Sequence, residues 1–334
     1  MPAELHDRAA AEAYVASVCF KHGPPRRLGV ELEWIVCHAH DPGGALDAAQ
    51  LADALGDHAP RSIRPDSPHH ELPAGSTVTV EPGGQVEIST PPCRSLSELL
   101  AVATGDTEAL TRRLEQAGLR LLHSGTDPVR APSRLVRSPR YDAMHDHYHR
   151  EGPSGHLMMC STAAQQVALD VGTAGQAGLR WAALHATGPV LAAVFANSAV
   201  LGGGATGHAS TRLHLWSGIG RAAHPPVDLT GRTHPGAGYA RHALDLPLLC
   251  VRRGDDWHAP PDRTFADWVA GALPTRPTTD DLDYHLTTLF PPVRPCGRYL
   301  EVRYLDAQPA GRWALPVAVL AALLADDATT AAAL

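Results

Sequence analysis

Acidic side chains at alternate positions are the main chemical signal in this sequence. Residues 28–36 read LGVELEWIV, so Glu31 and Glu33 fall on one face of an extended strand and the large apolar residues fall on the other. Neighbouring side chains on one face of a strand lie about 7 Å apart. From this strand alone, the two carboxylates fit a solvated outer face as well as they fit a functional site.

Three further segments repeat the alternation: residues 77–89 (TVTVEPGGQVEIS), 166–170 (QVALD) and 298–306 (RYLEVRYLD). Their polar positions are Glu81, Glu87, Gln166, Asp170, Glu301 and Arg303. If these strands share a sheet, a single face carries five glutamates. Such a cluster repels itself unless cations compensate it, and carboxylate oxygens suit hard divalent ions. A Mg²⁺ ion that also binds nucleotide phosphates fits best, and zinc fits less well because no HExxH or Cys/His ligand spacing is present.

The elements that must position these side chains are short strands between long helices. Alternation predicts strands at residues 28–36, 77–81, 86–90, 119–123, 167–171 and 300–305. Helical spacing predicts helices at residues 7–20, 95–116 and 175–197, the second with a Ser95–Glu98 capping box. Strands and helices do not alternate regularly. We therefore expect an α+β fold, in which an antiparallel sheet with a carboxylate-lined face is flanked by helices.

The composition excludes several classes of function. The chain has 334 residues, of which 44% are hydrophobic and 19% charged, so it can bury a large core. Its 28 Lys plus Arg against 35 Asp plus Glu leave a net charge of −7, which disfavours nucleic acid and anionic membranes as partners. Lys21 is the only lysine, so we expect arginines to meet any phosphate group.

The cysteine pattern and the apolar segments indicate a cytoplasmic protein. The six cysteines are widely spaced and form no CxxC pair, which predicts reduced thiols. The first residues lack the basic and apolar regions of a secretory signal. No apolar stretch reaches the roughly 18 residues that a membrane span needs.

Seven segments occur in a characteristic order: GVELEW, EPGGQVEIS, MMCSTAAQQVALD, GPVLAAVFANS, STRLHLW, LDYHLTTLFPPVRP and YLEVRYLDAQP. In these segments, from about Leu28 to about Leu324, the chain resembles the plant-type glutamate-cysteine ligase family. It is most similar to the actinobacterial branch that makes γ-glutamylcysteine for ergothioneine biosynthesis. The resemblance implies the catalytic sheet of glutamine synthetase. It also implies a single catalytic domain over residues 1–334, shortened at its C-terminus relative to the family.

The resemblance further implies an ATP-dependent ligase that uses Mg²⁺ and joins the γ-carboxylate of glutamate to the amine of cysteine through a γ-glutamyl phosphate. Its partners are then small-molecule substrates, and its oligomeric state stays undetermined. By position in the motifs, the implied Mg²⁺ ligands are Glu31, Glu33, Glu81, Glu87 and Glu301. Gln166 stands beside the metal, and Arg212 and Arg303 contact phosphate or a substrate carboxylate. Arg303 also fits a cross-strand ion pair with Glu301 that has no catalytic role.

Three departures from the family pattern fall inside motifs. Ala168 replaces an asparagine, Gly220 stands at an aspartate position, and Ala222 or Ala223 stands at an arginine position that Arg221 fills only with a shift in register. These departures keep two other interpretations open. One is a carboxylate-amine ligase with another acceptor amine, and the other is a catalytically weak paralogue that binds nucleotide or glutamate.

Overall fold

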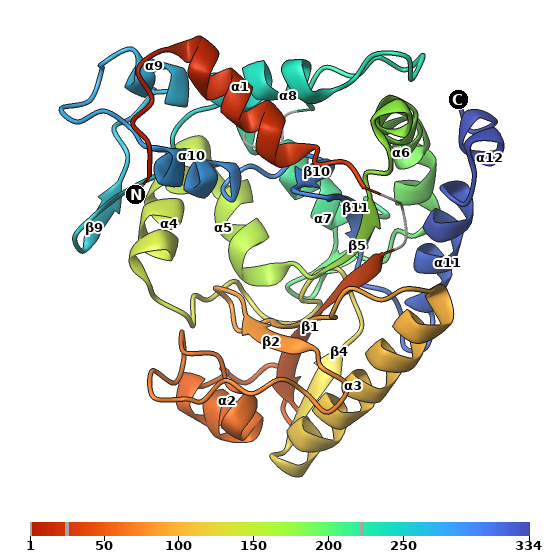
Figure 1. Ribbon diagram of the computed structural model, residues 1–334. Helices are drawn as coiled ribbons and strands as arrows, with labels where there is room; N and C mark the ends of the chain where they lie inside the picture. The colour runs from red at the N-terminus through yellow and green to blue at the C-terminus, as the bar shows by residue number, and fades with distance from the viewer. Residues whose placement is uncertain (1, 24–26, 221–223) are drawn as a thin grey trace.

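A seven-stranded sheet forms the centre of the computed structural model, which describes residues 2–23, 27–220 and 224–334 (Figure 1). Its strands are β1 (Leu28–His38), β2 (Thr77–Val80), β3 (Val86–Ser89), β4 (Leu119–Leu122), β5 (Ala164–Asp170), β10 (Val293–Cys296) and β11 (Tyr299–Asp306). Their order is β10-β11-β5-β1-β3-β2, with β4 also paired to β1. Each of these pairs is antiparallel, which confirms the predicted α+β class.

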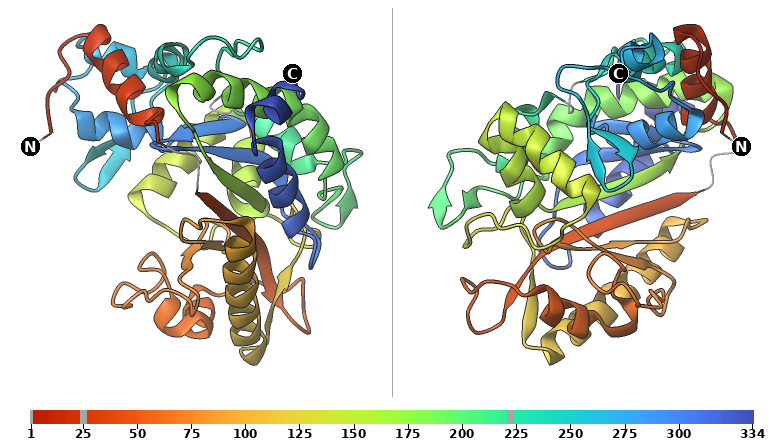
Figure 2. Two further views of the ribbon diagram at one scale, coloured as in Figure 1. Left: turned by 45° about the vertical axis from the view of Figure 1, so that its right-hand side comes forward. Right: turned by 90° about the vertical axis from the view of Figure 1, so that its left-hand side faces the viewer.

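Helices surround the sheet (Figures 1 and 2). They are α1 (Arg8–Cys19), α2 (Ala48–Leu55), η1 (Gly56–His58), α3 (Leu96–Gln116), α4 (Pro139–Glu151), α5 (Pro153–Ser161), α6 (Ala174–Val194), α7 (Thr211–Ser217), α8 (Gly236–Asp245), α9 (Phe265–Val269), α10 (Thr279–Leu286), α11 (Ala314–Leu323) and α12 (Asp327–Ala331). Helices α2 and α3 pack together at the bottom of Figure 1, whereas α1, α8, α9 and α10 gather at the top. Two small hairpins complete the fold, β6 (Val200–Leu201) with β7 (Gly204–Ala205) and β8 (Cys250–Arg253) with β9 (Asp256–His258).

The predicted helices form with small changes at their ends. Helix α3 begins after Ser95, whose side chain accepts a hydrogen bond from the Glu98 N–H at 3.1 Å. Only half of the predicted capping box forms, because the Glu98 carboxylate accepts from the Arg94 N–H instead. Helix α6 ends at Val194, three residues before the predicted end at Asn197, because the Asn197 N–H donates to Asp306 Oδ2 at 2.8 Å.

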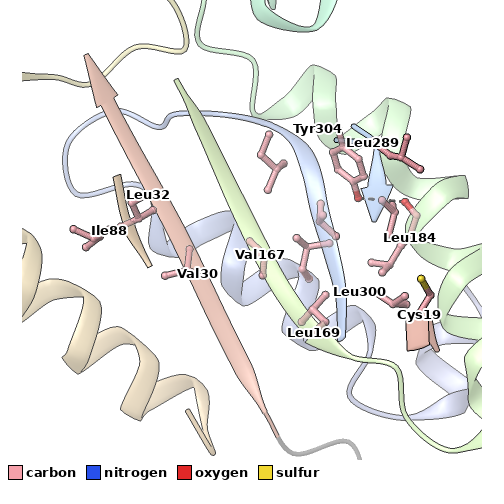
Figure 3. Close-up of a cluster of buried hydrophobic side chains, with 14 of the residues drawn as sticks. Cys19, Val30, Leu32, Ile88, Val167, Leu169, Leu184, Leu289, Leu300 and Tyr304 are labelled. Atoms are coloured by element: carbon pink, nitrogen blue, oxygen red, sulfur yellow. Dashed lines mark hydrogen bonds between the residues drawn. The ribbon is translucent and has the colours of Figure 1, made fainter. Parts of the chain in front are cut away.

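The apolar face of the sheet carries the core. Figure 3 shows side chains of neighbouring strands side by side on this face, among them Val30, Val167 and Leu300, each at most 2% exposed. They pack against helices that include α6, where the Tyr304 hydroxyl donates to the Leu184 carbonyl. Burial on this face supplies much of the energy of folding. The opposite face is therefore left to carry charge.

Two further predictions about the whole chain can be compared with the structure. All six cysteines carry free thiols, as their spacing predicted. None of the described helices combines the length and the apolar character that crossing a membrane requires.

Candidate functional site

The polar face of the sheet forms one wall of a cavity of about 340 Å³. The predicted residues that line it are Glu31, Glu33, Glu81, Glu87, Gln166 and Arg303. Arg294 on β10 lies beside them, and α4 and the segment after α10 contribute Arg140, Tyr141 and Thr287. Two predicted site residues, Glu301 and Arg212, are not part of this lining.

The registers of the strands align these side chains. Directly opposed residues of an antiparallel pair project to the same face. The opposed pairs on this face are Glu31 with Gln166, Glu33 with Glu87, Ala168 with Glu301, and Glu301 with Arg294. The alternation in four separate segments therefore converges on one surface, as the sequence predicted.

Three of the glutamates carry negative charge that the protein does not balance. Burial, followed by the charge of Glu301, raises the pKa of Glu31 to about 7. Burial and the charge of Glu33 raise the pKa of Glu81 to about 7. Burial and the neighbouring carboxylates also raise the pKa of Glu87 well above its usual value, although the Thr79 hydroxyl donates to it at 2.6 Å.

Glu33 is held differently, because the protein supplies hydrogen-bond donors to both of its carboxylate oxygens. The Ala164 N–H donates to Oε2 at 2.7 Å, and the Gln166 side-chain amide donates to Oε1 at 3.0 Å. The carbonyl oxygen of the same Gln166 amide accepts from Arg303 Nη1. Gln166 therefore links a carboxylate on β1 to a guanidinium on β11.

Glu301 is paired with two arginines. Arg294 donates through Nε to Oε2 at 2.7 Å and through Nη2 to Oε1 at 3.1 Å, and Arg303 Nη1 donates to Oε2 at 2.7 Å. Burial by itself would raise the pKa of Glu301, but Arg294 and Arg303 together lower it to about 2. The side chain is 2% exposed, so Glu301 is a buried, ionised carboxylate with both oxygens engaged.

Arg212 lies behind the cavity wall and is 1% exposed. Its Nη2 donates to the Arg303 carbonyl at 2.9 Å, and its Nη1 lies 3.9 Å from Asp306 Oδ1. Its guanidinium also stacks over the Trp216 ring, with 5.2 Å between the carbon and the ring centroid. In this arrangement Arg212 contacts the backbone that carries Arg303, and its assignment as a phosphate or carboxylate ligand stays a prediction.

Sequence reasoning missed two arginines of the cavity. Arg294 lies in the proline-rich segment PPVRP, which does not read as a strand, although it directly precedes the strand that carries Glu301. Arg140 lies at the start of α4 and donates to the carbonyl and hydroxyl oxygens of Thr287. No periodic signal in the sequence pointed to Arg140.

The donor chemistry of the cavity fits a hard divalent cation. The described residues donate no hydrogen bond to the carboxylate of Glu31 or Glu81, and the pKa values of both are raised by burial and by neighbouring negative charge. Carboxylate oxygens with uncompensated charge are the ligands that Mg²⁺ prefers. Among the described residues, no group of three Asp, Glu, His or Cys side chains is arranged closely enough to hold a metal ion in this conformation.

Of the departures from the family pattern, Ala168 lies beside this site, Gly220 is not among its lining residues, and the others lie outside the described residues. Ala168 lies directly opposite Glu301 and, with Glu31, lines a second cavity of about 560 Å³. Gly220 is exposed, and a Cβ there would meet only a carboxylate oxygen of Glu151, at 3.8 Å. The other positions of the predicted departure, Arg221, Ala222 and Ala223, lie outside the described residues.

Comparisons with known proteins agree with the resemblance seen in the motifs. The family model of glutamate-cysteine ligase family 2 matches residues 27–334. The glutamate-cysteine ligase EgtA of Mycobacterium tuberculosis is 39% identical over 331 residues, which cover 97% of this chain and 74% of that protein. A chloroplastic glutamate-cysteine ligase A of Oryza sativa is 32% identical over 72% of this chain and 50% of that protein.

Solved structures give a more distant match. A glutamate-cysteine ligase from Francisella tularensis, in complex with AMP, matches 86% of this chain and 62% of that chain. The sequence identity is 12% and the TM-score is 0.49.

Proposed function

Because this chain belongs to glutamate-cysteine ligase family 2, we propose that it joins the γ-carboxylate of glutamate to the amine of cysteine at the expense of ATP. The product, γ-glutamylcysteine, then serves ergothioneine biosynthesis. The observation that carries this proposal is the convergence of four glutamates and the guanidinium of Arg303 in one cavity. The reaction runs in the cytoplasm, in keeping with free thiols at all six cysteines.

The reaction has two steps. An oxygen of the glutamate γ-carboxylate attacks the γ-phosphorus of ATP, and the bond to the β-phosphate oxygen breaks to release ADP. The amine of cysteine then attacks the carbonyl carbon of the γ-glutamyl phosphate, loses a proton and displaces inorganic phosphate. Because the protein forms no covalent bond in either step, its part is to position the reactants and to balance charge.

Each part of the cavity has a role in this proposal. Glu31, Glu81 and Glu87 would hold Mg²⁺, because theirs is the negative charge that the protein leaves unbalanced. Bound Mg²⁺ would neutralise phosphate charge and orient the phosphates for in-line attack. Arg303 stabilises the charge that develops on the transferred phosphoryl group, and Arg140 meets the α-carboxylate of glutamate.

A specific observation favours a second candidate, a ligase for a larger acceptor amine. An adjoining cavity of about 550 Å³ shares Trp216, Phe290 and Arg303 with the first, and most of its other lining residues are apolar. A cysteine side chain would fill only a small part of such a space. An acceptor with a bulky apolar side chain would bury more surface there.

The test is ADP release by the purified chain with ATP, Mg²⁺ and glutamate, with and without cysteine, combined with the mass of the product. We expect cysteine-dependent ADP release and the mass of γ-glutamylcysteine. Faster release with a bulky apolar amine than with cysteine would favour the second candidate. Binding of Mg·ATP without release for any amine would overturn both ligase assignments in favour of a nucleotide-binding paralogue.

Glu87→Gln provides a control in the same assay. This variant removes one predicted metal ligand, and we expect it to lose turnover by about a hundredfold or more. If the variant retains full turnover, the ADP release comes from a contaminating enzyme or from a site other than this cavity.

A further inference from the structure

Two arginines contact Glu301, but they do so in different ways. Arg294 uses two nitrogens, Nε and Nη2, one on each carboxylate oxygen, at 2.7 Å and 3.1 Å. It lies directly opposite Glu301 in the ladder of β10 and β11, so the strand pairing itself sets this two-point contact. Two parallel hydrogen bonds of this kind fix both the position and the orientation of a carboxylate.

Arg303 contacts Glu301 through a single nitrogen. Its Nη1 donates to Glu301 Oε2 at 2.7 Å and also to the Gln166 side-chain carbonyl. Its Nε has no hydrogen-bond partner among the described residues, and none of their hydrogen bonds uses its Nη2. The guanidinium carbon lies 5.5 Å from the centroid of the Trp216 ring and 5.9 Å from that of Phe290.

The position of Arg303 therefore does not depend on Glu301 alone. Its guanidinium carbon lies within cation–π distance of the Trp216 and Phe290 rings, and Arg303 lines both the acidic cavity and the apolar cavity next to it. Its Nε is buried, whereas its Nη2, which none of the described hydrogen bonds uses, remains available to a ligand. Nη2 stays available only while Glu301 is paired with another cation, because a buried carboxylate with one partner would draw Arg303 into a two-point contact.

We propose that Arg294 is a positioning residue, which saturates Glu301 and so keeps Arg303 available for the phosphate groups of the nucleotide. This inference rests on the proposed function, because it assigns the phosphates of ATP to Arg303. Arg294 acts through Glu301 and Arg303 and does not itself contact the reacting atoms. Without Arg294, Glu301 would take Arg303 as its two-point partner, and the loss would resemble the loss of Arg303.

The test is a double-mutant cycle of Arg294→Gln and Arg303→Gln, read by calorimetric titration with Mg·ATP and by turnover. We expect each single variant to weaken Mg·ATP binding or turnover by about tenfold or more. The double variant should be no worse than Arg303→Gln alone, within about twofold, because the two residues act as a unit. Losses that multiply in the double variant would overturn the proposal.

Arg294→Lys separates the proposed role from a purely structural one. Lysine keeps the positive charge but has no two-nitrogen fork, so we expect partial recovery of Mg·ATP binding relative to Arg294→Gln. If Arg294→Gln fails to fold, the cycle is run with Arg294→Lys, and the same lack of additivity is expected. Full activity of Arg294→Lys and Arg294→Gln would show that the fork is not needed and would overturn the proposal.

Arg120→Gln is the matched control, because it removes an exposed arginine from β4 of the same sheet. We expect it to bind Mg·ATP and turn over like the unaltered chain. If the unaltered chain turns over but the losses in the cycle are additive, the role proposed for Arg294 is wrong and the proposed function stands. An unaltered chain that binds no Mg·ATP overturns the proposed function and this role with it.

Discussion

At the scale of single residues, the five glutamates divide into two groups according to what their oxygens contact. Glu33 and Glu301 accept hydrogen bonds from built-in donors at both oxygens. Glu31, Glu81 and Glu87 have raised pKa values, because burial and neighbouring carboxylates act on them and no described arginine forms an ion pair with them. Residue type is the same in both groups. The partners therefore decide which carboxylates belong to the fold and which are left for a cation.

This division predicts that Glu81→Gln stabilises the chain when no divalent cation is present. At pH 8 the substitution removes a buried, unbalanced negative charge, so the free energy of unfolding should rise by about 1 kcal/mol. The same change removes a metal ligand, and Mg²⁺ should bind about tenfold more weakly. Thermal denaturation in EDTA and a Mg²⁺ titration measure the two effects.

Glu33→Gln is the matched comparison, and it should lower the free energy of unfolding in the absence of a divalent cation. Glutamine has only one side-chain oxygen, so its NH2 group would face one of the two donors that Glu33 now accepts from, the Ala164 N–H or the Gln166 amide. Leaving a buried donor without a partner costs about 1–3 kcal/mol. If both variants shift the melting temperature in EDTA in the same direction, the division of the glutamates is wrong.

At the scale of elements, the turn between β2 and β3 determines where Glu81 and Glu87 lie. Gly84 has a φ of +87°, which favours glycine, and a Cβ on Gly83 would lie 2.1 Å from the Cys160 carbonyl oxygen. This close approach packs the hairpin against the end of α5. The two glycines are therefore needed for the acidic cavity as well as for the turn.

We predict that Gly83→Ala destabilises the chain by about 1–3 kcal/mol and lowers Mg²⁺ affinity, because backbone must move to admit the methyl group. Gly105→Ala is the control, since Gly105 lies in α3 with nothing within 4 Å of an added Cβ. That change should stabilise the chain by about 0.5–1 kcal/mol through helix propensity. Chemical denaturation measures both effects, and a neutral Gly83→Ala would contradict the packing of this turn.

The strands of the sheet were predictable because each buries one face and leaves the other polar, which produces alternation in the sequence. Strand β10 was not predictable, because Pro295 argues against a strand. The proline is tolerated there because β10 lies at the edge of the sheet. Arg294 was missed for the same reason. Arg140 was missed because its place in the cavity depends on how α4 packs, and no local pattern encodes that packing.

At the scale of the whole molecule, the two faces of the sheet have opposite effects on the stability of the fold. The apolar face stabilises the fold, whereas the acidic face holds charges that repel one another without a cation. The predicted set of five metal ligands describes the composition of this face correctly. It did not show that Glu33 and Glu301 already accept hydrogen bonds from the protein at both oxygens, because hydrogen-bond partners depend on strand order and register.

This opposition predicts how stability depends on pH. Glu31 and Glu81 have pKa values of about 7 in the folded chain, above the usual value of about 4.5. The folded chain therefore binds more protons than the unfolded chain between these values, and the free energy of unfolding falls as pH rises through about 7. Burial and the charge of Glu301 raise the pKa of Glu31, and Arg303 and Arg294 oppose this rise. Burial and the charge of Glu33 raise the pKa of Glu81, and Arg140 and Arg303 oppose this rise.

Buried histidine limits the pH range in which this effect can be measured alone. Burial lowers the pKa of His185 to about 3, so its contribution to stability is lost as pH falls below about 6.5. The informative range is therefore pH 6.5 to about 8.5. A comparison of the unaltered chain with a Glu31→Gln, Glu81→Gln double variant removes the histidine contribution, because His185 is the same in both.

In EDTA, we expect the unaltered chain to lose stability from pH 6.5 to about 8.5 and the double variant to lose much less. Mg²⁺ should stabilise the unaltered chain strongly at about pH 8.5 and weakly at about pH 6.5, because it competes with protons for the same carboxylates. Thermal denaturation at matched ionic strength measures both differences. Two results would contradict this prediction: equal stabilisation by Mg²⁺ at the two pH values, or an equal loss of stability with pH for the two chains in EDTA. Either result would mean that the charges of these glutamates are already balanced in the folded protein.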